Sequence, residues 1–149
     1  MSFTTPSGTR QPRGALLRFA TRMSVDHVRR TGGKSMGMNV LILSTVGRKS
    51  GKVHQTPVAW FAGAGGSWIV VASANGAPKH PSWYLNLAAH PDRVTIEVQG
   101  RKVPVTAEEL RGAERDAAWE QVVREVPRFG TYRQKTDRVL PVIRLVERG

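Results

Sequence analysis

The chain has 149 residues, 40 % of them hydrophobic and none of them cysteine. This length suits one domain with a proper core, and the lack of cysteine excludes disulfides and thiolate metal sites. No apolar run approaches the ~20 residues that a membrane-spanning helix needs, and the polar start lacks the apolar segment of a signal peptide, so a cytoplasmic protein is expected. The net charge of +12 leaves nucleic acid, an anionic membrane and an anionic small molecule as candidate partners. The remaining interpretation of this charge is an arginine-rich surface without a specific partner, as in many actinobacterial proteins.

The N-terminal region is interpreted as a tail followed by a helix. Residues 1–10 are expected to form a disordered tail, and residues 11–149 a single domain. Pro12 lies just before a segment in which apolar residues recur near helical spacing, from Leu16 to about Arg30, and Thr31-Gly32-Gly33 is typical of a helix end. Two interpretations stay open for this basic helix. It packs on the domain with a solvated face, or it rests on an anionic membrane surface as a peripheral contact.

From Met38 onward the sequence consists mainly of short apolar runs that are typical of strands. We expect strands at residues 38–46, 54–62, 67–73, 93–99, 101–107 and 139–146, and helices at residues 82–89 and 112–125. Pro104 predicts that its strand lies at a sheet edge or contains a bulge. About six short antiparallel strands with few helices indicate an α+β fold built on a small barrel.

The turn between the first two expected strands is the strongest candidate for a binding site. It reads Gly47-Arg48-Lys49-Ser50-Gly51-Lys52 and joins two apolar runs. Glycines permit tight backbone conformations there, while three cations, a hydroxyl and free amides supply charge and directed donors for an anion. We expect this turn to hold the phosphate end of a flavin-like cofactor whose ring lies in a pocket built by the rest of the chain.

Two further stretches are candidates for the walls of that pocket. In residues 72–87, small residues at a strand end let a flat ring approach the backbone, and Ser82 is expected to cap the helix that follows. Asn86 lies in an otherwise apolar helix and requires a hydrogen-bond partner if it is buried, which favours a site-shaping role. Residues 126–138 form an aromatic, basic loop, interpreted either as a lid over the barrel or as a substrate wall with Tyr132 as a proton donor.

Several common cofactor and catalytic motifs are absent. Gly47 lies too close to Gly51 for a P-loop, and the turn joins two strands instead of opening a helix, so ATP is not the expected ligand. No dinucleotide-binding glycine motif follows a strand, and no nucleophile elbow is present. The four histidines show no helical pair with metal-ligand spacing, so no metal site is expected.

Together these stretches resemble the deazaflavin-dependent nitroreductase and quinone reductase family, which uses coenzyme F420. The resemblance covers about residues 38–146, and the order of its motifs makes it specific. The motifs are Leu43-Ser44-Thr45-Val46-Gly47-Arg48-Lys49-Ser50-Gly51, Pro57, Val70-Val71-Ala72-Ser73, Pro81-Ser82-Trp83-Tyr84-Leu85-Asn86-Leu87, Thr136-Asp137-Arg138 and Leu140-Pro141-Val142. The family implies a split β-barrel of the flavin-reductase and pyridoxamine-oxidase-like type. It also implies that reduced deazaflavin donates a hydride to a small-molecule acceptor: a quinone, an activated enone or a nitroaromatic.

The resemblance implies roles for individual residues. Arg48, Lys49 and Ser50 hold the cofactor phosphate in this interpretation. Ser73 or Tyr132 stabilises or protonates the acceptor oxygen, as backbone amides also do. The other implied cofactor-binding residues flank the ring, close its side or face the substrate: His54, Gln55, Thr56, Pro57, Val58, Ala59, Val71, Ala72, Ser73, Ala74, Ser82, Trp83, Tyr84, Leu85, Asn86 and Phe129.

The sequence departs from the family pattern at two places. His54 stands where the family often has arginine, so Lys52 and Lys79 are expected to supply part of the grip on the anionic tail. Phe129 and Ala59 stand where nitroimidazole-activating relatives can carry tyrosine. The loss of those hydroxyls argues against nitroimidazole activation and leaves enone or quinone reduction open.

Two alternatives to an F420-dependent enzyme stay open. The first is a reductase that binds FMN or FAD on the same barrel. The second is a non-enzymatic cofactor carrier or a nucleic-acid binder. The net charge of +12 permits nucleic-acid binding, but no aromatic-basic platform or recognition-helix pattern supports it. Monomer and homodimer are both compatible with the sequence.

Overall fold

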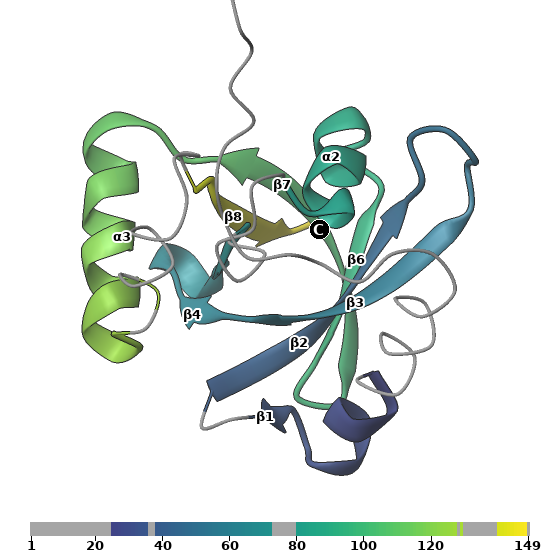
Figure 1. Cartoon of the computed structure of the whole chain (residues 1–149), viewed down its shortest axis with the longest axis horizontal. Helices are drawn as coiled ribbons and strands as arrows, with labels where there is room; N and C mark the ends of the chain where they lie inside the picture. Colours follow the sequence, from purple (N-terminus) through teal and green to yellow (C-terminus); the bar gives the residue numbers. More distant parts are fainter. Residues whose placement is uncertain (1–24, 36–37, 73–79, 128, 130–139, 149) are drawn as a thin grey trace, which may run out of the picture.

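The chain folds into a curled antiparallel sheet flanked by helices (Figure 1). The computed structural model describes residues 25–35, 38–72, 80–127, 129 and 140–148, and the predicted tail lies outside these ranges. The described elements are β1 (Lys34–Ser35), β2 (Met38–Val46), β3 (Val53–Ala59), β4 (Phe61–Ala62), the 3₁₀ turn η1 (Ala64–Gly66), β5 (Trp68–Val71), α2 (Ser82–Ala89), β6 (Val94–Val98), β7 (Arg101–Glu109), α3 (Gly112–Glu125) and β8 (Val142–Glu147). The strands join in the order β1-β2-β6-β7-β8-β5-β4, with β3 beside β2. This arrangement confirms the predicted split-barrel class.

The two internal helices agree with the sequence prediction at both ends. α2 covers residues 82–89 and α3 covers residues 112–125. The prediction that Ser82 caps α2 is wrong, because Pro81 occupies the cap position with extended backbone and Ser82 is the first helical residue. The Pro81 carbonyl accepts the first helical bond, from the Tyr84 backbone N–H at 3.1 Å. A proline fixes the φ that this entry into a helix requires.

The end of the N-terminal helix also agrees with the prediction. Residues 25–30 are helical, and the Gly33 N–H donates to the Val28 carbonyl at 2.9 Å. Gly32 and Gly33 have φ of +72° and +89°, which ends the helix in the left-handed conformation that glycine tolerates. The earlier part of the predicted helix lies outside the described residues.

The strand predicted at residues 54–62 is wrong as a single element, because the chain changes partners within it. β3 pairs with β2 up to the pair of Val40 and Ala59. The Trp60 N–H then donates to the Asn39 carbonyl at 3.0 Å, and β4 pairs with β5 instead. One short segment therefore links two distant edges of the sheet and helps to curl it. The other predicted strands agree with β2 and β5 to β8 to within a few residues.

The prediction that the strand containing Pro104 lies at a sheet edge or contains a bulge is also wrong, because this strand is paired on both sides. β7 lies between β6 and β8, and Pro104 pairs with Thr95 of β6. On the other side, the pairing with β8 begins at Val105, and the Pro104 carbonyl accepts the Arg148 N–H at 2.9 Å, beyond the end of β8. The missing N–H of proline therefore faces a position where the neighbouring strand has already ended.

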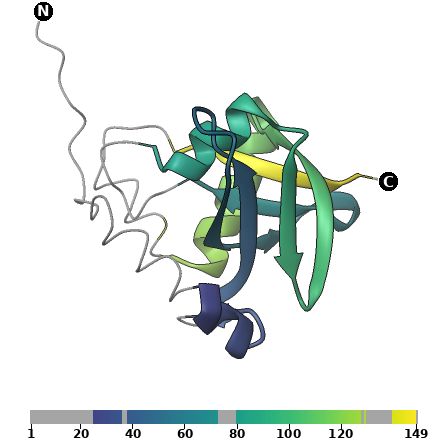
Figure 2. The same ribbon diagram turned by 90° about the vertical axis from the view of Figure 1, so that its right-hand side faces the viewer.

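The core divides along β2 because alternate residues of a strand point to opposite faces. Leu41 and Leu43 belong to the largest buried cluster, together with Trp83 and Leu87 of α2. Ile42 faces the other way, toward the end of the N-terminal helix. α2 therefore covers the inner face of β2. In both views α2 lies above the sheet and the helical segment at residues 25–30 lies below it (Figures 1 and 2).

Candidate functional site

The basic turn predicted from the sequence is a closed loop of the β2–β3 hairpin. The Gly47 N–H donates to the Lys52 carbonyl at 2.7 Å, and the Gly51 N–H donates to the Gly47 carbonyl at 2.9 Å. Gly51 has a φ of +72°, a conformation that a side chain would strain. These bonds fix the backbone of residues 47–52 while the intervening side chains remain exposed.

Close packing over Gly47 brings the hydroxyl of Ser50 to the base of the turn. A Cβ at Gly47 would lie 2.6 Å from Ser50 Oγ and 2.9 Å from His54 Nε2. The Lys52 backbone N–H donates to Ser50 Oγ at 3.2 Å. Because Ser50 Oγ accepts this bond, its own proton is left to donate to an external acceptor. Together with Lys49, this gives the turn a directed donor and a cation on its exposed surface.

Asn86 of α2 joins the turn to the helix. Its Oδ1 accepts two hydrogen bonds from Arg48, one from the backbone N–H at 3.2 Å and one from Nη1 at 3.1 Å. Asn86 is only 5 % exposed, so the sequence prediction that it needs a partner is confirmed. The turn is thereby held against the same helix that contributes Trp83 to the core.

The remaining residues predicted to bind the cofactor fall into buried, partly exposed and exposed groups. Val58, Ala72 and Trp83 are buried in the cluster that also contains Leu41 and Leu43. Val71 is buried in the neighbouring cluster beneath α3. Thr56, Pro57, Ala59, Tyr84 and Leu85 are partly exposed, whereas His54, Gln55 and Ser82 are exposed. Ser73, Ala74 and Tyr132 lie outside the described residues. The buried members shape the barrel, and the exposed ones leave surfaces that a ligand can contact.

Phe129, the residue predicted to face the substrate, packs in the cluster beneath α3. It is 5 % exposed and meets Phe61 edge to face, with ring centroids 5.7 Å apart and an interplanar angle of 82°. This geometry is favourable for an aromatic pair. The structure thus gives Phe129 a packing role, and its contact with substrate stays a prediction.

Tyr84 links α2 to the end of β7. Its hydroxyl donates a short hydrogen bond to Glu109 Oε1, and the His80 ring lies 4.8 Å from its own, between centroids. Burial, followed by the hydrogen bond to Glu109 and the charge of that carboxylate, raises the pKa of Tyr84 from 10.0 to about 12. With its proton directed to Glu109, Tyr84 offers a ligand its ring edge instead of its hydroxyl proton. Sequence reasoning missed Glu109, because a strand-end carboxylate carries no signal of its partner.

Sequence reasoning also missed Thr45, which precedes the turn on the inner face of β2. Its side chain is 1 % exposed, and its Oγ1 has no hydrogen-bond partner within the described part of the chain. An unpaired buried hydroxyl costs about 1–3 kcal/mol, which a polar ligand group reaching the inner face would recover. A polar residue following the apolar run Val40-Leu41-Ile42-Leu43 was the available signal.

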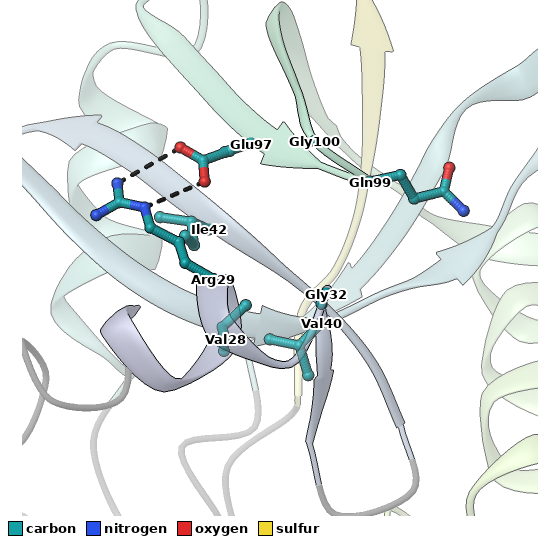
Figure 3. Close-up of a pocket in the computed structure, with 9 residues that line it drawn as sticks. Val28, Arg29, Gly32, Val40, Ile42, Glu97, Gln99 and Gly100 are labelled. Atoms are coloured by element: carbon teal, nitrogen blue, oxygen red, sulfur yellow. Dashed lines mark hydrogen bonds and ion pairs between the residues drawn. The ribbon is translucent and has the colours of Figure 1, made fainter.

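A separate hollow lies at the other end of β2 (Figure 3). It has a volume of about 150 Å³, is floored by Val28, Val40 and Ile42, and is bordered by an ion pair between Arg29 Nε and Glu97 Oε2 at 3.1 Å. Pockets for cofactor-sized ligands usually measure about 300–1,000 Å³. This hollow is therefore too small for a tricyclic cofactor, and it shares no residue with the turn.

The residues around the turn fit an anionic cofactor. Arg48, Lys49 and Lys52 provide three cations, Ser50 provides a hydroxyl donor, and no acidic side chain lies within residues 47–52. The orphaned hydroxyl of Thr45 adds a polar group on the inner side. Such donors suit a phosphate. Among the described helices, none combines the length and apolar character needed to cross a bilayer.

A curled antiparallel sheet with a cationic turn held against an aromatic helix defines the class: a split β-barrel of the flavin-reductase type. The family model described as F420H(2)-dependent quinone reductase matches residues 16–147. The chain belongs to this family and is an F420-dependent oxidoreductase.

Individual relatives agree with this membership. An F420H(2)-dependent quinone reductase of Mycobacterium tuberculosis (strain H37Rv) is 37 % identical over 112 residues, covering 72 % of this chain and 73 % of the relative. The solved structure of an F420-H2 dependent reductase (FDR-A) is 38 % identical, with a TM-score of 0.63 over 71 % of this chain and 92 % of that chain.

Two other solved structures extend the comparison. One, described as a domain-swapped dimer, is 33 % identical, with a TM-score of 0.65 over 85 % of this chain and 97 % of that chain. A Listeria innocua protein assigned to the pyridoxamine 5′-phosphate oxidases is only 10 % identical, with a TM-score of 0.53 over 85 % of this chain and 93 % of that chain. This last likeness concerns the fold alone.

Proposed function

We propose that the chain binds reduced F420 with the anionic tail at the turn of residues 47–52 and reduces a quinone beside α2. The observation that carries this proposal is the double hydrogen bond from Arg48 to Asn86, which holds the cationic turn of residues 47–52 against the helix that borders the barrel core. The family match supports the cofactor, and the turn supports where its charged end binds.

The cofactor contacts follow from exposure. Lys49 and Ser50 contact the phosphate directly, because both side chains are exposed on the fixed turn. Arg48 contributes charge from beside Asn86. The ring would lie against β3, the end of β5 and α2, and the residues that would hold it are His54, Gln55, Thr56, Pro57, Val58, Ala59, Val71, Ala72, Ser73, Ala74, Ser82, Trp83, Tyr84 and Leu85.

The protein's part in the reaction is orientation and charge stabilisation. When bound, reduced deazaflavin supplies the hydride. The barrel wall holds the acceptor against the ring, which supplies proximity. Negative charge then develops on the acceptor oxygen. Backbone amides stabilise this charge, and Ser73 or Tyr132 stabilises or protonates the oxygen.

Among acceptors, we propose that quinones are preferred over nitroaromatics. The relatives and the family model are described as quinone reductases. Ala59 and Phe129 carry no hydroxyl, and Phe129 packs against Phe61 inside the core, so neither residue offers a hydrogen bond to a nitro group. Activated enones resemble quinones in placing the developing charge on a carbonyl oxygen and remain within the proposed range.

For the assembly we propose a homodimer in the cytoplasm, supported by the 33 % identical neighbour described as a domain-swapped dimer. Light scattering coupled to size-exclusion chromatography tests it, and a monomeric mass at micromolar concentration would contradict it.

Peripheral membrane contact through the basic N-terminal segment is a further proposal. Sedimentation with anionic vesicles, but not with neutral ones, is the expected result.

The proposed function is tested by separate fluorescence titrations with F420, FMN and NADPH, followed by anaerobic oxidation of F420H2 with menadione as the quinone. We expect the protein to bind F420 but neither FMN nor NADPH, and to oxidise F420H2 only when the quinone is present. Binding of FMN in place of F420 would support the alternative of a flavin enzyme on the same barrel. F420 binding without turnover on quinone, enone or nitroaromatic acceptors would indicate a cofactor carrier.

A further inference from the structure

Asn86 is held more firmly than the turn that it contacts. It lies in α2 between Trp83 and Leu87, and all three side chains are buried. Trp83 and Leu87 pack in the same cluster as Leu41 and Leu43 of β2. The amide oxygen of Asn86 is therefore fixed relative to the sheet, whereas Arg48 is exposed.

The two hydrogen bonds to Asn86 restrain both the backbone and the side chain of Arg48. The backbone N–H and Nη1 converge on the same oxygen, at 3.2 and 3.1 Å. A guanidinium has five N–H donors, so the bond from Nη1 leaves others available to a second acceptor. Because the guanidinium is a rigid plane, fixing one end limits the directions in which the others point.

We propose that Asn86 is a positioning residue that acts through Arg48 and determines affinity for the charged tail of the cofactor, not for its ring. This inference rests on the proposed function, since it requires the tail to lie at the turn. In the absence of the Asn86 oxygen, the Arg48 guanidinium extends into solvent and the turn loses its anchor to α2. Holding the cation in place beforehand spares the ligand the entropy cost of ordering it.

Two ligands separate this role from a purely structural one. F420 carries the phosphate and acidic tail, whereas the same deazaflavin chromophore without that tail presents only the ring and its ribityl chain. In Asn86→Leu we expect affinity for F420 to fall by about tenfold or more, while affinity for the tail-less chromophore changes by less than about twofold. Ser67→Ala serves as the matched control, because Ser67 is also buried and donates a single local bond, to the Ala64 carbonyl at 2.7 Å. It should bind both ligands as the wild type does.

A double-mutant cycle tests whether Asn86 acts through Arg48. If it does, adding Asn86→Leu to Arg48→Ala should weaken F420 binding by less than Asn86→Leu does alone, because Arg48→Ala leaves only the backbone hydrogen bond to be lost. Additive losses, or an equal loss for both ligands in Asn86→Leu, would overturn the inference and leave the proposed function intact. Wild-type protein that binds F420 no better than the tail-less chromophore would overturn tail binding at the turn, and the inference with it.

A second variant covers the case in which Asn86→Leu does not fold. Asn86→Asp is nearly isosteric and keeps an acceptor for Arg48, but its carboxylate offsets the guanidinium charge. We expect the Arg48 backbone amide to stay protected from hydrogen exchange in the ligand-free protein, while affinity for F420 still falls and affinity for the tail-less chromophore does not. Loss of Arg48 protection, or unchanged F420 affinity, would contradict a positioning role.

Discussion

Replacing Gly47 by alanine is expected to disorganise the anion-binding turn with little effect on the rest of the fold. The added methyl would lie 2.6 Å from Ser50 Oγ and 2.9 Å from His54 Nε2. Both are side-chain atoms near the surface, so the side chains move by about 1 Å instead of the backbone. Ser50 then loses the hydrogen bond from the Lys52 N–H. A typical net contribution for such a bond is about 1 kcal/mol, which is the expected loss of stability.

Gly47→Ala should weaken F420 binding by somewhat more free energy than it removes from the stability of the fold. A displaced Ser50 hydroxyl no longer points its proton at the phosphate, so we expect Gly47→Ala to bind F420 about tenfold more weakly, equivalent to about 1.4 kcal/mol. Urea denaturation measures the first quantity and fluorescence titration the second. Ser50→Ala is the matched control and should show a similar loss of affinity without steric crowding. In the double variant Gly47→Ala/Ser50→Ala, the two losses of F420 affinity should not add. Fully additive losses, or normal F420 binding by Gly47→Ala, would refute the reasoning.

Three other predictions concern single side chains. Lys49→Ala should weaken F420 binding by about 1–3 kcal/mol, whereas Lys102→Ala, an exposed lysine on β7, should not; equal affinities in a titration would remove Lys49 from the phosphate site. Tyr132→Phe should slow quinone reduction while F420 affinity is retained, and unchanged turnover would exclude it as the proton donor. In Tyr132→Phe protein, Tyr84 is the only tyrosine and should titrate near pH 12 by ultraviolet absorbance; Glu109→Gln should lower that pKa.

The raised pKa of Tyr84 also predicts the direction of a stability change. The folded state holds the phenol proton more tightly than the unfolded chain, whose pKa is 10.0. The stabilisation is therefore complete below pH 10 and is lost as the pH rises through about 12. Tyr84→Phe should show a smaller loss of stability over this interval, and an identical loss in both proteins would assign it to other groups.

The sequence by itself determined the local elements and the chemistry of the turn. Residues 82–89 and 112–125 form the helices that their composition predicted, and β2 has the predicted bounds. These segments carry their information locally, in apolar spacing and in the prolines that follow the two helices, Pro91 and Pro127. The cations and the serine of the 47–52 turn likewise indicated an anion site before its geometry was known, because donor type and charge depend only on residue identity.

Tertiary structure alone decided which groups meet. Trp60 separates β3 from β4 because the chain leaves β2 for β5 there, and no local pattern specifies a change of partner between distant strands. The pairing of Arg48 with Asn86 and of Tyr84 with Glu109 joins residues 38 and 25 positions apart. Such contacts depend on how α2 packs across the sheet, and side-chain burial and hydrogen bonding fix that packing only once the whole core has formed.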